Sequence, residues 1–483
     1  MDIRTVITKV EEMGELVRIQ REVDPDTELA SVLKRIDELS YRPVVLFEKL
    51  KGSGKVRVLG HLYSETKRLS RLLNLPDDPL EYKKRVLELW KNAIKPKMVK
   101  TGPCKENVVL NDGKSFDITK IIPPIIGAKN SPKNRRYYHP LVVTKHPETG
   151  DRNVGIYRSC VQSPTEISVN LRPIKHGGFH FTAAKEADKK LPVALVIDAA
   201  PQITMVATTN IPYTHDEFAY AGGMMGEAVE LVPCETIDLE VPASAEIVIE
   251  GEILTPYKYG TDGPWPEFLG YLSDVLHPPI MSVTAVTFRD NPINYVFIPS
   301  TKDDWNLEGL GYDVTLYSVV KNFAPDLVID VNLTSGSFKY HHAIIQVRKS
   351  DPTHEPRNIS VALAAFNWAS WLDVVILVDE DINIYNYEKI DWAISTRCDP
   401  SKQIHILPVG AGHKVNPICG VRESTDGKIS KGKMIIDATI PWEYKNIEKI
   451  PGVKYFTVSE WLDVKLKDYL SPKDFEKWSG KTK

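Results

Sequence analysis

The stretch HHAIIQVRK (341–349), followed by PRNISVALAAFNWAS (356–370) and LDVVILVDED (372–381), decides the fold class. Its short apolar runs, bounded by polar residues, predict strands, and the longer segment between them predicts a helix. KIDWAISTR (389–397) and QIHILPV (403–409) continue the alternation. Helices that alternate with apolar strands indicate an α/β domain with a parallel component in its sheet.

Towards the N-terminus the predicted elements are shorter and more mixed. Residues 1 to about 25 predict an amphipathic helix and a short strand, PVVLFEKLKGSGKVRVLGHLY (43–63) predicts two strands around a Gly/Ser turn, and residues 64–95 predict charged helices. A strand-rich middle follows, with a helical segment at FTAAKEADKK (181–190). The tail TVSEWLDVKLKDYLSPKDFEKW (457–478) predicts an amphipathic helix that could pack on another subunit.

Composition excludes several classes of protein. The 483 residues suffice for two to four domains. The 61 basic and 64 acidic residues leave a net charge of −3, so we expect no nucleic-acid or anionic-membrane partner. No apolar run is long enough to predict a membrane span, and the charged N-terminus lacks a signal-peptide core. Five scattered cysteines without CxxC spacing indicate reduced thiols in a cytoplasm, and only five glutamines lean towards a thermophile.

The segment TDGPWPEFLGY (261–271) places two acids, Asp262 and Glu267, in one Gly/Pro-rich bend. Five residues turn a helix through about 500°, and an odd spacing sends strand side chains to opposite faces, so only an irregular loop makes the acids converge. Pro264 and Pro266 each fix φ and stiffen such a loop. The alternative interpretation is a solvated surface turn.

RNVGIYR (152–158) supplies Asn153, whose amide oxygen is a hard metal ligand, and Arg158, whose planar guanidinium suits a carboxylate. An ideal strand would point the two side chains in opposite directions, so a bulge or a position at the rim of a barrel is needed for both to face one site. The alternative is a half-exposed strand with a solvated arginine.

RPIKHGGFHF (172–181) carries two histidines, and THDEFAYAGGMMGEA (214–228) carries a third candidate ligand. His176 lies beside two glycines and is a better ligand candidate than His180, although a histidine can equally be a satisfied polar residue. Glu217 follows Thr214 by three residues, which fits a capping box. A carboxylate at a helix start can also hold a cation beside a bound phosphate, and the two roles compete.

Taken together, NVGIYR, the long segment 211–253, DGPWPEFLGY and VDEDINIYNYEKIDWAISTRCDP (378–400) resemble the UbiD family of reversible decarboxylases that use prenylated FMN. The resemblance runs from about residue 10 to about residue 445. It implies an α/β (α+β) fold with a small N-terminal α/β domain (1–115), a central split-barrel flavin-binding domain (116–310) and a C-terminal α/β oligomerisation domain (311–445), followed by a helical tail (446–483).

The resemblance also implies a site. Asn153, His176 and Glu217 match the family's ligands for a divalent metal, Mn²⁺ or Mg²⁺, that bridges to the flavin phosphate; His180 stays open as the histidine, and K⁺ is a further candidate. Arg158, Asp262 and Glu267 match a Glu-Arg-Glu network, with Asp262 standing where ferulic acid decarboxylases have a glutamate. The residues implied to line the cofactor are Asn153, Gly155, Ile156, Tyr157, Arg158, Lys175, His176, Ala207, Thr208, Thr209 and Glu217.

By this resemblance the protein is a carboxy-lyase for an α,β-unsaturated or aromatic acid, such as a hydroxybenzoate or trans-anhydromevalonate phosphate. Arg158 would clamp the substrate carboxylate, Asp262 would orient Arg158, and Glu267 would return a proton to carbon after CO₂ leaves. A flavin prenyltransferase would supply the cofactor, and the protein would form a homodimer or larger homo-oligomer.

Two other classes of protein fit the sequence less well. A flavin reductase-like oxidoreductase with ordinary FMN would need a nicotinamide site, and no GxGxxG segment follows a predicted strand. A scaffold with a relict site is disfavoured because every polar position of the set is filled.

Overall fold

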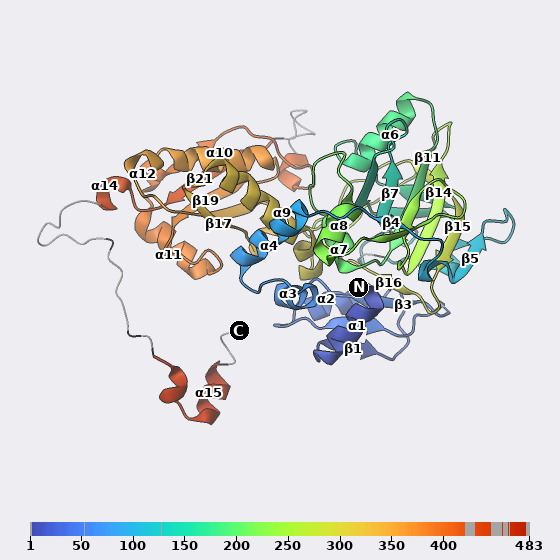
Figure 1. Ribbon diagram of the computed structural model, residues 1–483, viewed down its shortest axis with the longest axis horizontal. Coiled ribbons are helices and arrows are strands. Elements are labelled where there is room, and N and C mark those ends of the chain that lie inside the picture. The colour runs from blue at the N-terminus through green and yellow to red at the C-terminus, as the bar shows by residue number, and fades with distance from the viewer. Residues whose placement is uncertain are drawn as a thin grey trace, which may run out of the picture.

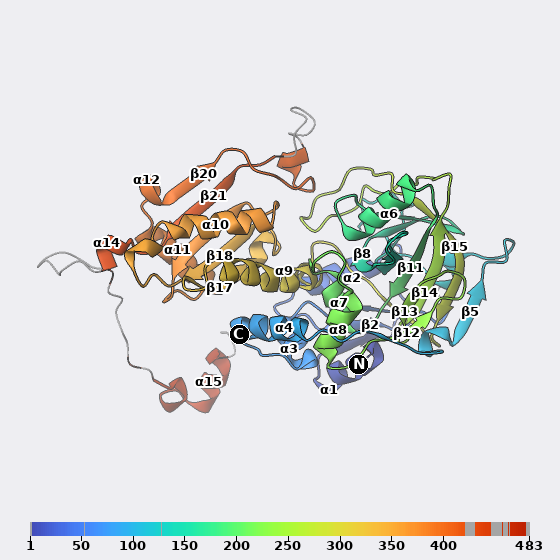
Figure 2. The ribbon, with the colours of Figure 1, turned by 45° about the horizontal axis from the view of Figure 1, so that its top comes forward.

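The computed structural model describes residues 2–52, 54–126, 128–420, 430–445, 456, 462 and 464–479. Three groups of elements are visible in Figure 1: a small N-terminal sheet with its helices in blue, a large curled sheet in green and yellow, and a C-terminal sheet in orange. The long helix α9 (Lys302–Phe323) lies between the large sheet and the C-terminal sheet in Figures 1 and 2.

The N-terminal sheet has the order β1-β2-β3-β16. Its strands are β1 (Leu16–Ile19), β2 (Val44–Phe47), β3 (Arg57–Gly60) and β16 (Ile293–Tyr295), and the last pairs parallel to β3. The helices of this region are α1 (Ile3–Glu12), α2 (Leu29–Asp37), α3 (Thr66–Leu73) and α4 (Pro79–Lys91). Asp2 caps α1 by accepting from the Thr5 amide, and Asp78 caps α4 by accepting from Leu80 and Glu81, so local chemistry starts both helices.

The large sheet is antiparallel and has the order β6-β9-β10-β15-β14-β11-β7-β8, with β5 also pairing β15. It curls into a half-barrel, and a smaller sheet of order β13-β12-β4 lies beside it. The strands of the two sheets are β4 (Lys97–Met98), β5 (Asn107–Leu110), β6 (Tyr137–Tyr138), β7 (Leu141–Lys145), β8 (Arg152–Ile156), β9 (Ser159–Ser163), β10 (Glu166–Val169), β11 (Leu191–Ile197), β12 (Glu230–Pro233), β13 (Glu240–Pro242), β14 (Ile247–Ile253) and β15 (Ile280–Phe288).

Four helices accompany the large sheet: α5 (Ile118–Ile121), α6 (His176–Glu186), α7 (Pro201–Ala207) and α8 (Glu217–Met225). The start of α8 is held against the sheet, and its later part lies directly on the C-terminal end of α4. A Cβ on Gly223 would lie 2.5 Å from the Leu89 carbonyl oxygen, and one on Gly222 would lie 2.6 Å from that of Ile94. Glycine is therefore required where the two segments meet.

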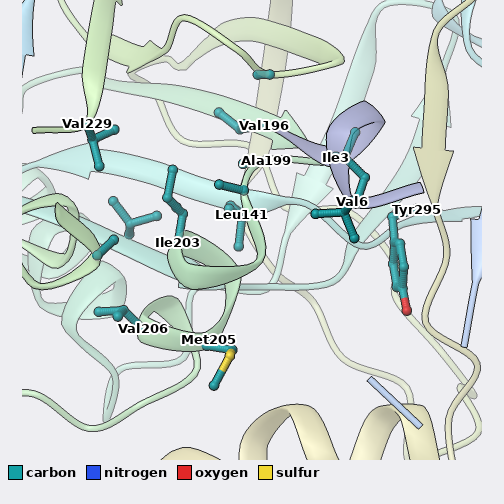
Figure 3. Close-up of a cluster of buried hydrophobic side chains, with 14 of the residues drawn as sticks. Ile3, Val6, Leu141, Val196, Ala199, Ile203, Met205, Val206, Val229 and Tyr295 are labelled. Carbon is teal, nitrogen blue, oxygen red and sulfur yellow. The ribbon is translucent and has the colours of Figure 1, made fainter. Parts of the chain in front are cut away.

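The apolar core joins these regions rather than separating them. Side chains from α1, the large sheet, α7 and β16 pack in one cluster, in which Ile3, Val196, Ile203 and Tyr295 are all buried (Figure 3). Packing of this kind transmits a displacement in one element to its neighbours.

The C-terminal sheet has the order β17-β18-β19-β21-β20, and its central three strands are parallel. Its strands are β17 (Val328–Leu333), β18 (His342–Val347), β19 (Val374–Asp379), β20 (Ile404–Leu407) and β21 (Lys433–Ala438), and its helices are α10 (Arg357–Trp368), α11 (Tyr387–Arg397), α12 (Pro400–Gln403) and α14 (Trp442–Lys445). The short 3₁₀ helices of the chain are Pro103–Lys105, Ser335–Ser337, Pro352–His354 and Leu466–Asp468.

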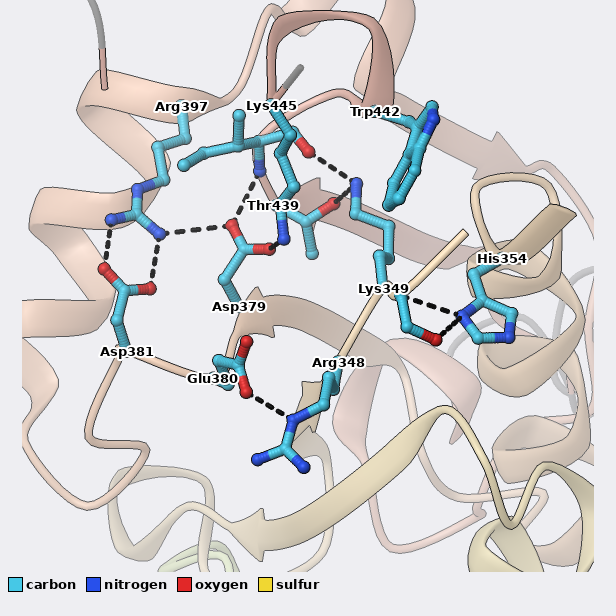
Figure 4. Close-up of polar contacts among 12 residues, drawn as sticks. Arg348, Lys349, His354, Asp379, Glu380, Asp381, Arg397, Thr439, Trp442 and Lys445 are labelled. Carbon is cyan, nitrogen blue, oxygen red and sulfur yellow. Dashed lines mark hydrogen bonds and ion pairs between the residues drawn. The ribbon is translucent and has the colours of Figure 1, made fainter. Parts of the chain in front are cut away.

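Ion pairs join α11 and α14 to the end of β19, the middle strand of the C-terminal sheet (Figure 4). Arg397 on α11 donates to Asp379 at 3.1 Å and to Asp381 at 2.6 Å, and Lys445 approaches Asp379 within 2.9 Å. Because Arg397 and Asp379 are both buried, the pairing offsets the cost of removing each charge from water.

The predicted mixed α/β fold is confirmed, including the parallel strands expected from residues 341–381. The predicted domain boundaries stay a prediction. Strand pairing crosses the boundary at residue 115: β4 and β5 precede it and pair with β12 and β15, and β16 follows it and completes the N-terminal sheet. The tail predicted as one amphipathic helix at 457–478 is described at 462 and 464–478, where a 3₁₀ turn at Leu466–Asp468 is followed by the helix α15 (Pro472–Ser479). The rest of that segment lies outside the described residues. No described helix is both long and apolar enough to span a membrane.

Candidate active site

A cavity of about 460 Å³ lies between the large sheet, α9 and a C-terminal loop at residues 412–415. Its wall includes the end of β8 and the residues after it, the loop before α6, the C-terminal end of α7, the N-terminal end of α8, and the bend at residues 265–268. Every candidate site residue from the sequence lines this cavity except Asp262, which lies behind Arg158, and the alternative histidine, His180. The residues that do so are Asn153, Gly155, Ile156, Tyr157, Arg158, Lys175, His176, Ala207, Thr208, Thr209, Glu217 and Glu267.

Arg158 lies between two carboxylates. Its Nε donates to Asp262 Oδ2 at 2.9 Å, and its Nη1 donates to Glu267 Oε1 at 2.5 Å. Burial opposes the charge of Arg158, yet Glu267 and Asp262 together raise its pKa above the ordinary value. The third nitrogen, Nη2, is buried and has no hydrogen-bond partner among the described residues. A guanidinium with two anchored nitrogens and one free nitrogen is suited to hold an anion in the cavity.

The bend that carries the two acids is an irregular hairpin. Asp262 exchanges backbone hydrogen bonds with Leu276, and the Glu267 amide donates to the Tyr271 carbonyl at 2.8 Å. Asp262 is 1% exposed and Glu267 is 9% exposed, so the alternative of a solvated surface turn is wrong. Gly263 has φ +91°, and a Cβ there would meet the Asp274 carbonyl oxygen at 2.6 Å. A loop with this geometry brings two acids to one arginine.

Asn153 and Glu217 form a buried polar pair of positions on the other side of the cavity wall. Asn153 lies on β8, and its Nδ2 is buried without a partner in the described chain. Glu217 Oε2 accepts from the Val154 amide at 2.9 Å. Burial raises the pKa of Glu217 to about 8. A carboxylate this poorly solvated fits a role beside a cation, which would restore its charge.

The capping-box interpretation of Glu217 is wrong. Asp216, not Thr214, is the N-cap of α8: its side chain accepts from the Phe218 amide and pairs with Arg152 at 2.8 Å. Thr214 has φ +75° and lies outside the helix. Since Asp216 caps the helix start, a capping box with Thr214 is not what holds Glu217, whose Oε2 accepts from the Val154 amide instead.

The two candidate histidines have different surroundings. His176 begins α6, lines the cavity and packs against Tyr213 with ring centroids 5.0 Å apart. Burial, and then the nearby Lys175, lower the pKa of His176, which keeps the neutral form that binds metals. His180 is fully buried, and its Nδ1 lies 2.9 Å from Thr144 Oγ1 outside the cavity lining. His176 is therefore the histidine that faces the site.

The donor set fits a hard divalent cation only if an amide takes part. No group of three His, Cys, Asp or Glu side chains comes together as a metal site within the described ranges. With Asn153 as a third donor, the cavity offers one imidazole, one carboxylate and one amide oxygen, which suit Mn²⁺ or Mg²⁺. The unpaired Asn153 amide and the poorly solvated Glu217 are the observations that support this fit.

The end of α7 is held tightly against α9. Thr208 Oγ1 and Thr209 Oγ1 donate to the Met205 carbonyl at 2.8 and 2.9 Å. A Cβ on Gly311 would lie only 2.1 Å from Thr209 Oγ1, so α9 approaches this wall as closely as a glycine allows. The hydroxyls are thereby turned inward to backbone, and the Ala207–Thr209 wall presents mainly main-chain and apolar atoms.

Several cavity residues were not found from the sequence. Asp304, Glu308 and Tyr312 lie four residues apart on α9, so helical periodicity could have placed them on one face. Phe268 stacks on Tyr340 with centroids 4.4 Å apart, and these rings come from segments that no local pattern connects. The further missed lining residues are His139, Asn170, Arg172, Trp265, Trp371, His413 and Lys414.

Comparison with known proteins identifies the chain. Family models described as the N-terminal, Rift-related and C-terminal domains of 3-octaprenyl-4-hydroxybenzoate carboxy-lyase match residues 7–85, 97–302 and 306–438. An uncharacterised protein of Synechocystis sp. is 31% identical, with 97% of this chain and 96% of that protein covered.

Two solved enzymes have the same fold. The UbiD-class enzyme HmfF from Pelotomaculum thermopropionicum, in complex with FMN, is 28% identical with a TM-score of 0.85, covering 98% of this chain and 100% of that one; an evolved dimeric form of HmfF is in complex with prFMN. Klebsiella pneumoniae 3,4-dihydroxybenzoic acid decarboxylase (AroY) is 27% identical with a TM-score of 0.86, covering 98% and 99%. These matches define a carboxy-lyase. Since the three family models together match most of the chain, the protein belongs to the UbiD family.

Proposed function

We propose that this protein reversibly decarboxylates an α,β-unsaturated or aromatic acid with prenylated FMN and a divalent metal. The observation that carries the proposal is Arg158, fixed by two buried carboxylates and left with one unpaired nitrogen in the cavity. The complexes of HmfF with FMN and prFMN support a flavin in the same fold.

The residues that would hold the cofactor form one wall. Asn153, His176 and Glu217 would hold the Mn²⁺ or Mg²⁺, and Lys175 would pair with the flavin phosphate. The main chain of 155–157 and of 207–209 would line the flavin. When bound, prenylated FMN supplies the electron sink that loss of CO₂ requires.

The chain's own side chains would perform three tasks. Arg158 Nη2 would donate to the substrate carboxylate and orient it. Glu267, on the opposite nitrogen of the same guanidinium, would deliver a proton to the carbon that loses CO₂. Asp262 would hold Arg158 from behind, since it binds Nε and does not line the cavity.

The lining favours an aromatic acid of the hydroxybenzoate type. Phe268, Tyr340, Tyr312 and Trp371 form a continuous set of rings, with Tyr312 and Trp371 centroids 5.6 Å apart. Such walls pack planar substrates by offset or edge contacts. The carboxylic acid that names AroY is of this kind.

A phosphorylated acid, such as trans-anhydromevalonate phosphate, is the second candidate because of one observation. Arg172 and Lys175 both line the cavity, and neither makes a side-chain hydrogen bond or ion pair in the described part of the chain. Two unpaired cations could bind a second anionic group. If the flavin phosphate occupies Lys175, Arg172 alone stays available for the substrate.

Around this site, the curled sheet would be the flavin-binding split barrel and the C-terminal lobe the oligomerisation domain of a homodimer or larger assembly. A flavin prenyltransferase would supply the cofactor. The oxidoreductase alternative with ordinary FMN is disfavoured by membership of a carboxy-lyase family.

The test is expression with and without a flavin prenyltransferase, followed by a screen of hydroxybenzoates and phosphorylated unsaturated acids for CO₂ release. Activity is expected only in protein whose bound flavin has the mass of the prenylated form. A matched variant, Glu217→Ala, should lose metal and flavin together, whereas Glu227→Ala, at the other end of α8, should keep both. Full decarboxylation by cofactor-free protein would end the proposal, as would unchanged metal content in Glu217→Ala for its metal part.

A further inference from the structure

His139 is a buried histidine that lines the cavity. It follows β6 directly, and Pro140 separates it from the start of β7. Its ring lies against Trp265, with centroids 5.1 Å apart, and Trp265 belongs to the bend that carries Glu267. The side chain is therefore on the Arg158–Glu267 side of the cavity.

Both ring nitrogens of His139 are buried, and neither has a hydrogen-bond partner among the described residues. Burial, and then the charge of Arg158, lower the pKa of His139 to about 3, so the ring is neutral at pH 7. A neutral imidazole has one N–H donor and one acceptor nitrogen. Leaving either unpaired in a buried position is unfavourable, which indicates that a ligand in the cavity satisfies at least one of them.

Arg158 is the charged group that acts on His139. Its Nη2, like Asn153 Nδ2 and Trp371 Nε1, is a buried donor of a cavity residue without a partner among the described residues. A carboxylate has two oxygens with about four lone-pair sites, so it can accept from Arg158 and His139 at once. On the opposite wall, Asn153 and Glu217 would face the cofactor and its metal, not this pair.

We propose that His139 contacts the substrate, donating its ring N–H to the same carboxylate that Arg158 holds. The inference rests on the proposed function. It gives the substrate carboxylate two donors from different elements, one from the end of β6 and one from the residues after β8, which fixes the plane of the group as well as its position.

Benzoate, a non-reactive carboxylate, is the probe. Its dissociation constant is measured by calorimetry on holoprotein made with a flavin prenyltransferase, for wild type, His139→Leu, His139→Asn and the control His405→Leu on β20. His139→Leu should weaken benzoate binding roughly 10–100-fold, the usual effect of one hydrogen bond to a charged group. Without benzoate its midpoint of thermal unfolding should equal or exceed that of wild type, because two unpaired nitrogens are removed. His139→Asn retains a donor and should recover part of the affinity.

A His139→Leu protein that binds benzoate like wild type overturns the inference. So does one that loses flavin while its benzoate affinity is unchanged, since the ring would then face the cofactor. If wild type and His139→Leu decarboxylate an acid with the same KM, this inference is overturned but the proposed function is not. A wild type that turns over no acid, yet binds benzoate in a His139-dependent way, overturns the proposed function and supports the inference.

Discussion

The guanidinium of Arg158 is the group on which both buried acids of the site meet. One positive charge is shared by Asp262 and Glu267, so the buried group already carries more negative than positive charge when both acids are ionised. A substrate carboxylate would be a third anion. Of the two acids, Glu267 is the one that lines the cavity, so it is the acid within reach of a bound substrate.

Glu267→Gln keeps the size and hydrogen-bonding capacity of the side chain but has no acidic proton. Turnover should fall by about 10²–10⁴-fold, the usual contribution of a positioned acid. Flavin and metal content should be retained, because Glu267 bonds to Arg158 and is not one of the proposed metal ligands. Exchange of solvent deuterium into the product carbon, followed by mass spectrometry, should fall in parallel.

Asp262→Asn is the comparison variant. Since the Asp262 side chain bonds to Arg158 and does not line the cavity, its loss should weaken substrate binding as well as rate, whereas Asp262→Glu should be tolerated or shift preference towards smaller acids. Near wild-type turnover by Glu267→Gln, with cofactor loading confirmed, would remove Glu267 from the mechanism.

At this scale the sequence predicted part of the site. The spacing of Asp262 and Glu267 required an irregular loop for them to converge, the family resemblance implied that they meet at Arg158, and the structure has both on Arg158. The capping box predicted for Thr214 and Glu217 was wrong because Asp216, two residues closer to the helix, is the cap. His139 was missed because its partner ring, Trp265, is distant in the chain and no local pattern relates the two.

Among the elements, α4 connects regions that are otherwise far apart in sequence. It packs on α8, whose first residue is Glu217, and its buried Lys83 reaches into the C-terminal sheet. Lys83 Nζ lies 3.0 Å from Asp330 Oδ1 and donates to Tyr385 Oη at 2.7 Å, while Tyr385 donates to Asp330 Oδ2 at 2.7 Å. These three residues join α4 to the C-terminal sheet.

Lys83→Met should destabilise the protein by roughly 3–5 kcal/mol, because it leaves Asp330 buried without a cation. The matched control is Lys84→Met: Lys84 is the next residue, is exposed and forms an ion pair with Glu81 at 2.8 Å, so its loss should cost at most about 1 kcal/mol. Denaturant unfolding of the two variants gives the comparison.

Lys83→Met combined with Asp330→Asn should recover part of the lost stability, since the uncompensated charge is removed. Equal unfolding midpoints for the Lys83 and Lys84 variants would show that Lys83, Asp330 and Tyr385 contribute nothing beyond an ordinary surface pair.

Elements with strong local patterns were predictable and those made by distant pairing were not. The apolar runs at 342–347 and 374–379 predicted β18 and β19, and their parallel pairing followed from the intervening helix α10. The run INYVFI (293–298), which contains β16, is apolar enough to predict a strand, but no window of sequence names β3 as its partner, because β3 lies more than 200 residues earlier in the chain.

For the whole molecule, the cavity carries an acid-dependent instability. Burial lowers the pKa of His139 to about 3 and that of His413 to about 4, against an ordinary value of 6.5. Below pH 6.5 the unfolded chain therefore binds protons that the folded chain refuses, and the free energy of unfolding falls as the pH falls towards 4. Each histidine contributes at most about 1.4 kcal/mol per pH unit.

Thermal unfolding midpoints recorded from pH 4.5 to 7 check this. The double variant His139→Leu/His413→Leu should lose stability less steeply on acidification than wild type, and the two curves should run parallel only above pH 6.5, where both histidines are neutral in the folded and the unfolded chain. Parallel curves across the whole range would assign acid lability to other groups.

The pairing of β16 with β3 also constrains how the chain is made. The ribosome completes β3 at residue 60 but reaches β16 only at residue 293, roughly 230 residues later. At about 5–20 residues per second, synthesis leaves one edge of the N-terminal sheet open for about 10–50 s. During that interval the nascent β3 presents unpaired backbone groups, a template for wrong partners. The first region to emerge is thus among the last to be finished, and the newborn polypeptide has reason to be shielded by chaperones until its middle has been translated.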